Sequence, residues 1–354
     1  MGAMGGTVMD ERALLAAAKG GDERAFERLV APHRSALHAH CYRMLGSVHD
    51  ADDALQDALL RAWRGLGGFE GRSSPKSWLY RIATNASLDA IGRRPKARVL
   101  PLDHSPATGA ADGPGPPLAE TVWVEPYPDA QLGLADGRAT PDARYEQREG
   151  VELAFVAALQ HLAPRQRAVL IVREVLGFSA KETAELLETT VASVNSALQR
   201  ARETVDGKLP ERTQQATLRS LGDARLEALV SGYMDAWERG SVDEIAHLLA
   251  EDVVLAMPPM ATWYVGDEVY VFLREWAFNG RVYDTLGRRR VRVLRTQANG
   301  QPALGVYSWV EAAGELRPTV LQVLTVDGGS VREIMGFVTP ALFARFGLPE
   351  SLPG

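Results

Sequence analysis

Cysteine is nearly absent from this chain of 354 residues, which contains only Cys41. An intrachain disulfide is therefore impossible, and this excludes the disulfide-stapled secreted domains and fits a reducing compartment. No run of about 18 apolar residues occurs, so we expect no membrane-spanning helix. The first ten residues, MGAMGGTVMD, lack a basic stretch followed by an apolar one. We therefore expect no secretory signal and predict a cytoplasmic protein.

An excess of basic residues is also missing. Lys and Arg number 39 against 45 Asp and Glu, which leaves a net charge of −6 and excludes a uniformly basic nucleic-acid-binding chain. The charge is uneven, because residues 101–145 contain seven acidic residues and two arginines. The charge of individual surface regions, rather than the net charge of the chain, therefore decides whether the chain binds nucleic acid.

Hydrophobic residues make up 46% of the chain, a normal share for folded domains, and the length suggests two or three of them. Helical spacing of apolar residues covers 10–95 and 146–210. Residues 96–145 are rich in Pro, Gly, Ala and Asp, which predicts a flexible acidic linker, although the island Trp123–Pro128 interrupts it. Residues 217–354 predict an α+β domain with a curved antiparallel sheet, so the expected fold is two all-α domains followed by that domain.

Breakers and periodicity place the expected elements. Gly46-Ser47 is expected to end one helix. Cys41 lies in that helix and is expected to be a buried core residue. A third helix should run from Lys76 to about Arg93. The last domain should begin with a helix over 217–239 and a short one near 242–249. Its expected strands are 253–257, 288–296, 303–310, 320–326 and 331–338.

Acidic residues gather on the expected second helix. Asp50, Asp53 and Asp57 lie at i, i+3 and i+7 on one face, with Gln56 alongside. Like charges at this spacing repel by a few tenths of a kcal/mol per pair. The face is therefore either a solvated surface or a docking surface for a basic partner.

The third helix combines aromatic and cationic residues. We expect Trp78, Leu79 and Ile82 to point into the core. A second group would then face a phosphate backbone or a splayed base, as single-strand capture requires. This group consists of Arg72, Lys76, Arg81, Asn85, Arg93 and Arg94.

The segment 50–94, DADDALQDALLRAW through SWLYRIATNASLDAIGRR, resembles region 2 of the extracytoplasmic-function (ECF) sigma factors. The resemblance implies that Asp53, Gln56 and Asp57, in the D-x-x-Q-[DE] pattern, bind RNA polymerase core at the clamp helices of its largest subunit. It also implies that the 72–76 loop and the following helix melt and read the −10 element.

Residues 164–203 have the spacing of a helix–turn–helix. Ser179 is the expected N-cap of its first helix and Thr189 or Thr190 that of its second. Ala184 and Leu187 are expected to pack against Val191, Val194 and Leu198. The outward residues would be side chains able to make paired hydrogen bonds to base edges in a major groove. They are Asn195, Ser196, Gln199, Arg200 and Arg202.

This second pattern resembles region 4 of the same sigma factors. The resemblance implies that its last helix reads the −35 element and that the module contacts the flap of the second-largest polymerase subunit. Glu188 stands where the family commonly has a turn glycine. Two modules in this order, joined by a tether, would hold two promoter elements at once, because linkage raises the effective concentration of the second module.

Residues 217–354 resemble the SnoaL-like, cone-shaped fold through 251–259, 263–266, 337–340 and 342–349. Six aromatic residues of this part form either a ligand pocket or an ordinary core. They are Trp263, Tyr264, Phe272, Trp276, Tyr307 and Trp309.

The same fold includes enzymes, but Asp267, Glu268 and His247 are the only nearby acid–base candidates and form no recognisable pair. We therefore expect no catalysis, no cofactor and no metal site. The run RRRVRVLR over 288–295 predicts a strand with a basic face. That strand is either a charged, solvated edge or a contact for the acidic linker or nucleic acid.

The leading hypothesis is a sigma factor that directs RNA polymerase core to promoter DNA. Its last domain would regulate activity through the core-binding domain or the linker and would hold an unknown small ligand. One alternative is a one-component helix–turn–helix regulator, which leaves 50–94 unexplained. The other is a SnoaL-type enzyme, which leaves both helical modules unexplained.

Overall fold

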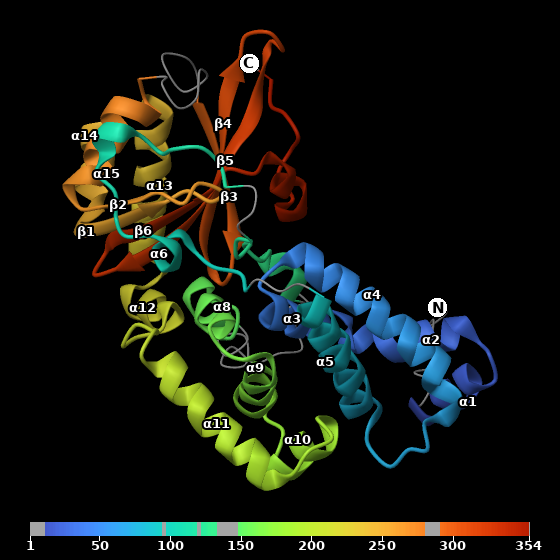
Figure 1. Ribbon diagram of the computed structural model, residues 1–354. Coiled ribbons are helices and arrows are strands. Elements are labelled where there is room, and N and C mark those ends of the chain that lie inside the picture. Colours follow the sequence, from blue (N-terminus) through green and yellow to red (C-terminus); the bar gives the residue numbers. More distant parts are fainter. Residues whose placement is uncertain (1–10, 94–96, 119–121, 133–147, 280–290, 354) are drawn as a thin grey trace. The chain divides into compact units, whose positions relative to one another are not determined.

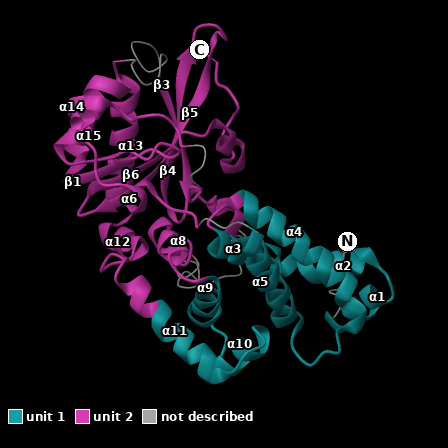
Figure 2. Cartoon of the chain, in the orientation of Figure 1, with its two compact units in different colours: residues 1–45, 49–94, 164–201 teal, residues 46–48, 95–163, 202–354 magenta. Residues whose placement is uncertain are grey.

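The computed structural model describes residues 11–93, 97–118, 122–132, 148–279 and 291–353. The chain divides into two compact units (Figures 1 and 2). Unit 1 contains residues 1–45, 49–94 and 164–201, and unit 2 contains residues 46–48, 95–163 and 202–354. Within the described ranges, no helix combines the length and apolar character needed to cross a membrane.

The first helices of unit 1 begin and end where local backbone preferences place them. The helix bounds are α1 (Glu11–Lys19), α2 (Glu23–Val30), α3 (Arg34–Leu45), α4 (Val48–Gly65) and α5 (Pro75–Arg93). Gly46 follows α3 with a φ of 67°, a left-handed conformation that glycine adopts without steric cost. Pro75 begins α5, where its missing N–H costs no hydrogen bond. The expected breaks are therefore confirmed.

The core of unit 1 forms around α3, whose last nine residues are all buried. Helix α4 buries small side chains, which allow close approach of neighbouring helices; these are Ala51, Ala54, Ala58 and Ala62. Cys41 is fully buried, as expected, and burial raises the pKa of its thiol to about 12. Nε2 of buried His40 lies 2.9 Å from Thr84 Oγ1 on α5, and burial lowers the pKa of this imidazole to about 3. His40 is therefore a neutral core residue.

Unit 1 also contains the helix–turn–helix, formed by α9 (Pro164–Leu170), a π-helical turn (Ile171–Val175), α10 (Ala180–Leu186) and α11 (Val191–Asp206). Ser179 caps α10 through a capping box, in which its hydroxyl accepts from Glu182 N and the Glu182 carboxylate accepts from Ser179 N. Thr190 caps α11 by accepting from Ser193 N at 3.1 Å.

Two details of this motif depend on its tertiary packing. Val194 and Leu198 are buried as expected, but Val191 is 43% exposed, because the first turn of α11 projects beyond the motif's core. Glu188 adopts a φ of 51° in the turn, the left-handed conformation for which a glycine would be the usual residue. The chain therefore forms the turn despite the side chain.

Unit 2 contains the α+β domain. Its helices include α12 (Gln214–Leu221), α13 (Asp223–Arg239), α14 (Val242–Leu248) and α15 (Asp267–Phe272). The single helix expected over 217–239 is divided into α12 and α13 at Gly222, whose φ of 80° ends α12. The strands are β1 (Leu249–Ala256), β2 (Trp263–Val265), β3 (Val291–Ala298), β4 (Gln301–Val310), β5 (Glu315–Asp327) and β6 (Ser330–Phe337).

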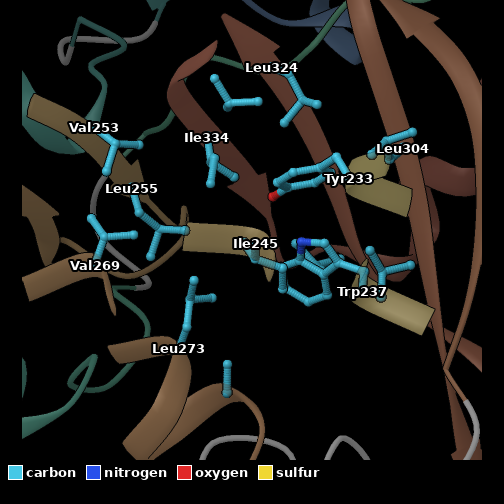
Figure 3. Close-up of a cluster of buried hydrophobic side chains, with 14 of the residues drawn as sticks. Tyr233, Trp237, Ile245, Val253, Leu255, Val269, Leu273, Leu304, Leu324 and Ile334 are labelled. Atoms are coloured by element: carbon cyan, nitrogen blue, oxygen red, sulfur yellow. The ribbon is translucent and has the colours of Figure 1, made fainter. Parts of the chain in front are cut away.

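These strands form one six-stranded sheet in the order β2-β1-β6-β5-β4-β3. The pairs β3–β4, β4–β5, β5–β6 and β1–β2 are antiparallel. The expectation of a purely antiparallel sheet is corrected at β1 and β6, which are parallel. Helices α13 and α14 pack on the sheet, where Tyr233, Trp237 and Ile245 meet Leu304, Leu324 and Ile334 (Figure 3).

Unit 2 also includes residues from the expected flexible linker. Val99 and Trp123 form an isolated bridge, in which Val99 N donates to Val122 O and Val124 N donates to Val99 O. Glu125 accepts from Ser47 Oγ at 2.8 Å and from Val48 N at 3.1 Å. Residues 97–118 and 122–132 are thus ordered against unit 2, whereas the rest of 96–145 lies outside the described residues.

The turn Asn299-Gly300 between β3 and β4 joins two remote segments of unit 2. Asn299 is fully buried; its Oδ1 accepts from Tyr127 N at 2.8 Å and its Nδ2 donates to Val151 O at 2.6 Å. Gly300 N donates to Asp129 Oδ1 at 2.8 Å. We call this arrangement the turn junction. It holds the Trp123–Pro128 island and the start of helix α8 (Leu153–Gln160) against the sheet.

A buried carboxylate makes a second junction between α8 and α12. Glu152, the residue before α8, accepts from Gln214 N at 3.1 Å and from Gln215 N at 2.7 Å, two otherwise unpaired N–H groups at the start of α12. Burial is the largest influence on this group and raises the pKa of Glu152 to about 7. The carboxyl therefore takes up a proton near neutral pH.

We predict that Asn299→Ala destabilises unit 2. The substitution strands the buried Tyr127 N–H and Val151 carbonyl, at about 1–3 kcal/mol for each unpaired group. It also places an alanine at φ 57°, which adds about 1–2 kcal/mol. Thermal unfolding and hydrogen exchange over residues 122–132 measure the effect. Asn299→Gly loses the same side-chain bonds without the backbone strain, so it should fall between wild type and alanine. Wild-type stability in the glycine variant would contradict the role of the amide.

We predict that Glu152 makes unit 2 less stable as the pH rises. Because its folded pKa lies above its ordinary value of 4.5, the folded state retains the proton longer, and this stabilisation is lost between about pH 4.5 and 7. The loss is at most about 3 kcal/mol. Glu152→Gln should flatten the dependence of the unfolding temperature on pH in this window. Glu350→Gln, at an exposed carboxyl, should retain the wild-type dependence; equal slopes in all three chains would contradict the assignment.

Candidate functional site

A groove of about 520 Å³ lies between α2 and α4 of unit 1. Its floor is apolar and is formed by Phe26, Val30, Leu55, Leu59, Leu60 and Trp63. Leu60 is 49% exposed, an unusual position for a large apolar side chain. Its rim is mainly acidic and includes Glu23, Glu27 and Asp52. The groove therefore suits a partner that presents apolar side chains flanked by basic ones.

The structure places the expected core-binding residues at or beside this groove. Gln56 lines it, and Asp53 is exposed on the same helix. Asp57 is half-buried and pairs with Arg61 at 2.7 Å, and Arg61 also bonds Asp89 of α5 at 2.6 Å. Asp50 is buried, which corrects its expected place on the exposed acidic face. The exposed acidic surface therefore consists of Asp53 and the groove rim.

The expected −10 residues surround the loop before α5. Arg72 and Lys76 are exposed, and Arg72 forms an ion pair with Glu70 at 2.9 Å. Arg81 is half-buried on α5, and Asn85 follows one turn later and is exposed. Trp78 and Leu79 are buried as expected, and Ile82 is half-buried. Arg93, the next of the expected residues, is exposed at the end of α5. Arg94 lies outside the described residues.

A second hollow, of about 540 Å³, adjoins this loop. One side is lined by the loop and α5, including Arg72, Ser74 and Arg81. The other side is formed by Glu182 and Glu185 of α10. Tyr80 of α5 and Phe178 pack edge to face with centroids 5.8 Å apart. Within unit 1, the acidic face of α10 therefore lies opposite the cationic loop.

The outward face of α11 carries the polar residues expected to read bases. All of them are exposed: Asn195, Ser196, Gln199, Arg200 and Arg202. Arg200 donates to Ser196 Oγ at 2.8 Å, one helical turn away. Val194 and Leu198 fix the opposite face in the core. Asn, Gln and Arg on one solvent-facing helix of this motif have the chemistry for base-edge contacts.

The structure brings three of the six candidate pocket residues, Tyr264, Phe272 and Trp276, to one core cluster, and Trp263 precedes Tyr264 on β2. Tyr264 and Phe272 are buried and stack with centroids 4.8 Å apart. Trp263 and Trp276 are half-buried, and each indole N–H donates to a main-chain carbonyl within residues 105–110. The four side chains come from β2, α15 and the following turn. They form an aromatic wall against which the chain's own segment lies.

Tyr307 and Trp309 lie apart from this wall. Leu304 and Val306 belong to the core cluster, and Tyr307 alternates with them on β4. Its ring packs against Phe343 with centroids 5.2 Å apart, and its hydroxyl donates to Pro349 O. Trp309 donates to Glu311 near the end of the strand. Strand alternation therefore assigns these two residues to a different environment.

The acid–base candidates of this domain do not converge. His247 is exposed on α14, with Nδ1 2.6 Å from Asp243 O. Asp267 is exposed, and Glu268 accepts from Ala110 N at 2.6 Å. In the part of the chain that the structure describes, no group of three or more His, Cys, Asp or Glu side chains is arranged to hold a metal.

The basic run of 288–295 forms part of the edge strand β3, and 288–290 lie outside the described residues. Arg292 forms an ion pair with Glu238 at 3.0 Å, and Arg295 pairs with Glu227. Both partners lie on α13. These two arginines are therefore matched by acids of their own domain.

Comparison with known proteins agrees with this arrangement. Family models match Sigma-70 region 2 over residues 29–96, Sigma-70 region 4 over 152–205 and a SnoaL-like domain over 230–334. The ECF RNA polymerase sigma factor SigG of Mycobacterium tuberculosis is 38% identical over 335 residues, which cover 94% of this chain and 86% of that protein. The chain belongs to the ECF RNA polymerase sigma factors.

Further relatives support the same family. The ECF sigma factor SigM of M. tuberculosis is 34% identical over 189 residues, covering 53% of this sigma factor and 79% of SigM. The crystal structure of M. tuberculosis SigJ, an ECF sigma factor, shares the fold with a TM-score of 0.55 and 22% identity. That comparison covers 90% of this chain and 97% of SigJ. Promoter-directed initiation of transcription is therefore the function of this sigma factor, rather than that of a one-component regulator.

Sequence patterns missed two features of this sigma factor. The apolar groove depends on Phe26 and Trp63, which approach with ring centroids 5.3 Å apart although they lie on different helices. Leu60 could have indicated the groove in the sequence, because it is a large apolar residue on the polar side of α4. The sequence indicated the aromatic residues around Trp276 as pocket candidates. Residues 105–118, which lie against them, contain no local pattern that predicts this contact.

Proposed function

We propose that this sigma factor binds polymerase core through the α2–α4 groove and its acidic rim, and that it reads promoter DNA through α5 and α11. The observation that carries the proposal is the exposed row of base-reading side chains on α11, held by a complete helix–turn–helix. Exposed Asp53 and Gln56 would contact the clamp of the largest polymerase subunit. The region 4 module would contact the flap of the second-largest subunit.

The hollow beside the −10 loop supports an additional step. Glu182 and Glu185 lie opposite Arg72 and Arg81, where the phosphates of a bound DNA strand would compete for the same cations. The two DNA-reading modules must also separate to reach promoter elements that lie apart. We therefore propose that loading onto polymerase core moves α10 away from the loop.

The C-terminal domain is proposed to regulate this sigma factor rather than to catalyse a reaction. Its polar junctions hold residues 122–132 and the start of α8, which belongs to the region 4 match. A change in this domain would therefore alter the tether between the two DNA-reading modules. The cytoplasm is the proposed location, since polymerase and the chromosome are found there.

We predict that Leu60→Ala and Asp53→Asn each weaken binding to polymerase core about tenfold, because buried apolar anchors and their charged surroundings dominate such interfaces. Fluorescence anisotropy of labelled sigma factor with sigma-free core, at low salt, measures the affinity. The expected loss is largest when both substitutions are combined.

Matched controls for this experiment come from unit 2. Val265 is also an exposed apolar residue, at 40%, and Asp235 is an exposed acid on α13. Val265→Ala and Asp235→Asn should bind core as the wild type does. Equal affinity across the groove variants and the controls would place the core-binding surface elsewhere.

We predict that Arg200→Ala reduces discrimination at the −35 element by about tenfold or more, since each good base contact provides about 1–3 kcal/mol. Transcription of a pooled genomic library with sigma-free core, followed by sequencing of the transcripts, measures both activity and promoter preference. Arg225→Ala, at an exposed cation of α13, is the matched control. An unchanged promoter set in Arg200→Ala would contradict the role of this side chain. Absence of any promoter-dependent transcript from the wild type would contradict the proposed function.

A further inference from the structure

Residues 105–118, which we call the strap, lie along the aromatic wall of the C-terminal domain. The strap follows segment 259–263 closely (Figure 1, where it runs from α6 past β2 and α15). Main-chain and side-chain hydrogen bonds join the two segments along their length. They are Ser105 Oγ to Ala261 O, Trp263 Nε1 to Ser105 O, Thr108 N to Trp263 O, Thr262 Oγ1 to Pro114 O and Leu118 N to Pro259 O.

Ala110 is the residue of the strap that enters the domain. It is fully buried and belongs to the same core cluster as Val269, Phe272 and Leu273. Its N–H donates to Glu268 Oε2 at 2.6 Å, and its carbonyl accepts from Trp276 Nε1 at 2.6 Å. The Glu268 carboxylate and the Trp276 indole therefore bind the N–H and the carbonyl of Ala110, and its methyl group packs in the core.

The wall also restricts the size of its occupant. A Cβ added to Gly113, which has a φ of 73°, would lie 2.7–2.9 Å from three atoms of the Trp276 ring. Three residues before Gly113, Ala110 is the strap residue whose side chain belongs to the core cluster. The site therefore accepts a short peptide segment that has a small apolar side chain and, three residues later, a glycine that passes close to the Trp276 ring.

Withdrawal of the strap would remove the Ala110 side chain from the core cluster and expose the apolar surface that it now covers, which is unfavourable. Such a site favours an occupant. We propose that the C-terminal domain contains a peptide-recognition site, which this chain fills with Ala110, and that a free peptide with the spacing Ala-x-x-Gly, as in Ala110–Gly113, competes for it. This inference deepens the regulatory role proposed above, because occupation in trans releases the tether between the DNA-reading modules.

The tethered strap has a high effective concentration, so a free peptide binds the wild type weakly and binds a chain without the strap sequence more tightly. The test uses the full chain with residues 105–114 replaced by a Gly-Ser sequence of equal length. The probe is the synthetic, acetylated and amidated peptide SPATGAADGP, which is residues 105–114. Calorimetry and tryptophan fluorescence should detect one bound peptide, with an affinity at least tenfold above that for the wild type.

Two comparisons test the chemistry of the site. In the replaced chain, Trp276→Phe should weaken peptide binding about two- to tenfold, the usual contribution of one hydrogen bond. A peptide in which alanine is replaced by leucine at the position of Ala110 should bind at least tenfold more weakly. Equal binding of the probe to wild-type and replaced chains, or binding to neither, would overturn the proposal. These measurements need no polymerase, so they remain decisive whether or not the core-binding assignment holds.

A single substitution provides an independent check if the replaced chain folds poorly. Gly113→Val places a branched side chain against the Trp276 ring and should raise hydrogen exchange over residues 105–118 at least tenfold. Exchange in β4, β5 and β6 should stay at the wild-type rate. Gly314→Val, at a glycine with a φ of 65° and open space around it, is the matched control, because it carries the same backbone strain without the ring contact. Unchanged exchange at Ala110 in Gly113→Val would contradict the close fit on which the site depends.

Discussion

The turn junction at Asn299-Gly300 is the constraint on which unit 2 depends. Asn299 is buried without any exposed surface, and its amide satisfies one donor and one acceptor from separate segments of the chain. Neither segment can leave without stranding a buried polar group. Because these segments are the Trp123–Pro128 island and the residue before Glu152, the C-terminal sheet holds an interior part and the C-terminal end of the stretch that joins the two sigma modules.

In the C-terminal domain, the need to pair polar groups also determines which segment of the chain lies against the aromatic wall. Trp276 and Glu268 are polar groups at the edge of an apolar cluster, and they meet the carbonyl and N–H of Ala110. The segment that covers these side chains belongs to the same chain. The strap thus connects the promoter-reading part of the sequence to a binding site that lies far away along the chain.

Local charge, rather than net charge, accounts for the interaction surfaces. The chain carries a net charge of −6, yet α11 exposes Arg200 and Arg202 and the −10 loop exposes Arg72 and Lys76. In contrast, Arg292 and Arg295 of the basic strand are matched by acids of α13. A run of arginines in the sequence is therefore a weaker indicator of DNA contact than single cations on the exposed face of a helix–turn–helix.

The sequence by itself determined the helices, their caps and most strands, as at Gly46, Ser179 and Thr190, because these features depend on local backbone preferences and on periodicity. It also indicated the two sigma modules and the exposed face of α11. Only the tertiary structure decided the parallel pairing of β1 with β6, the place of Tyr307 away from the aromatic wall, and the ordered strap. Those features depend on contacts between residues about 80 to 158 positions apart or on which side of a sheet is covered, and neither leaves a periodic signal in the chain.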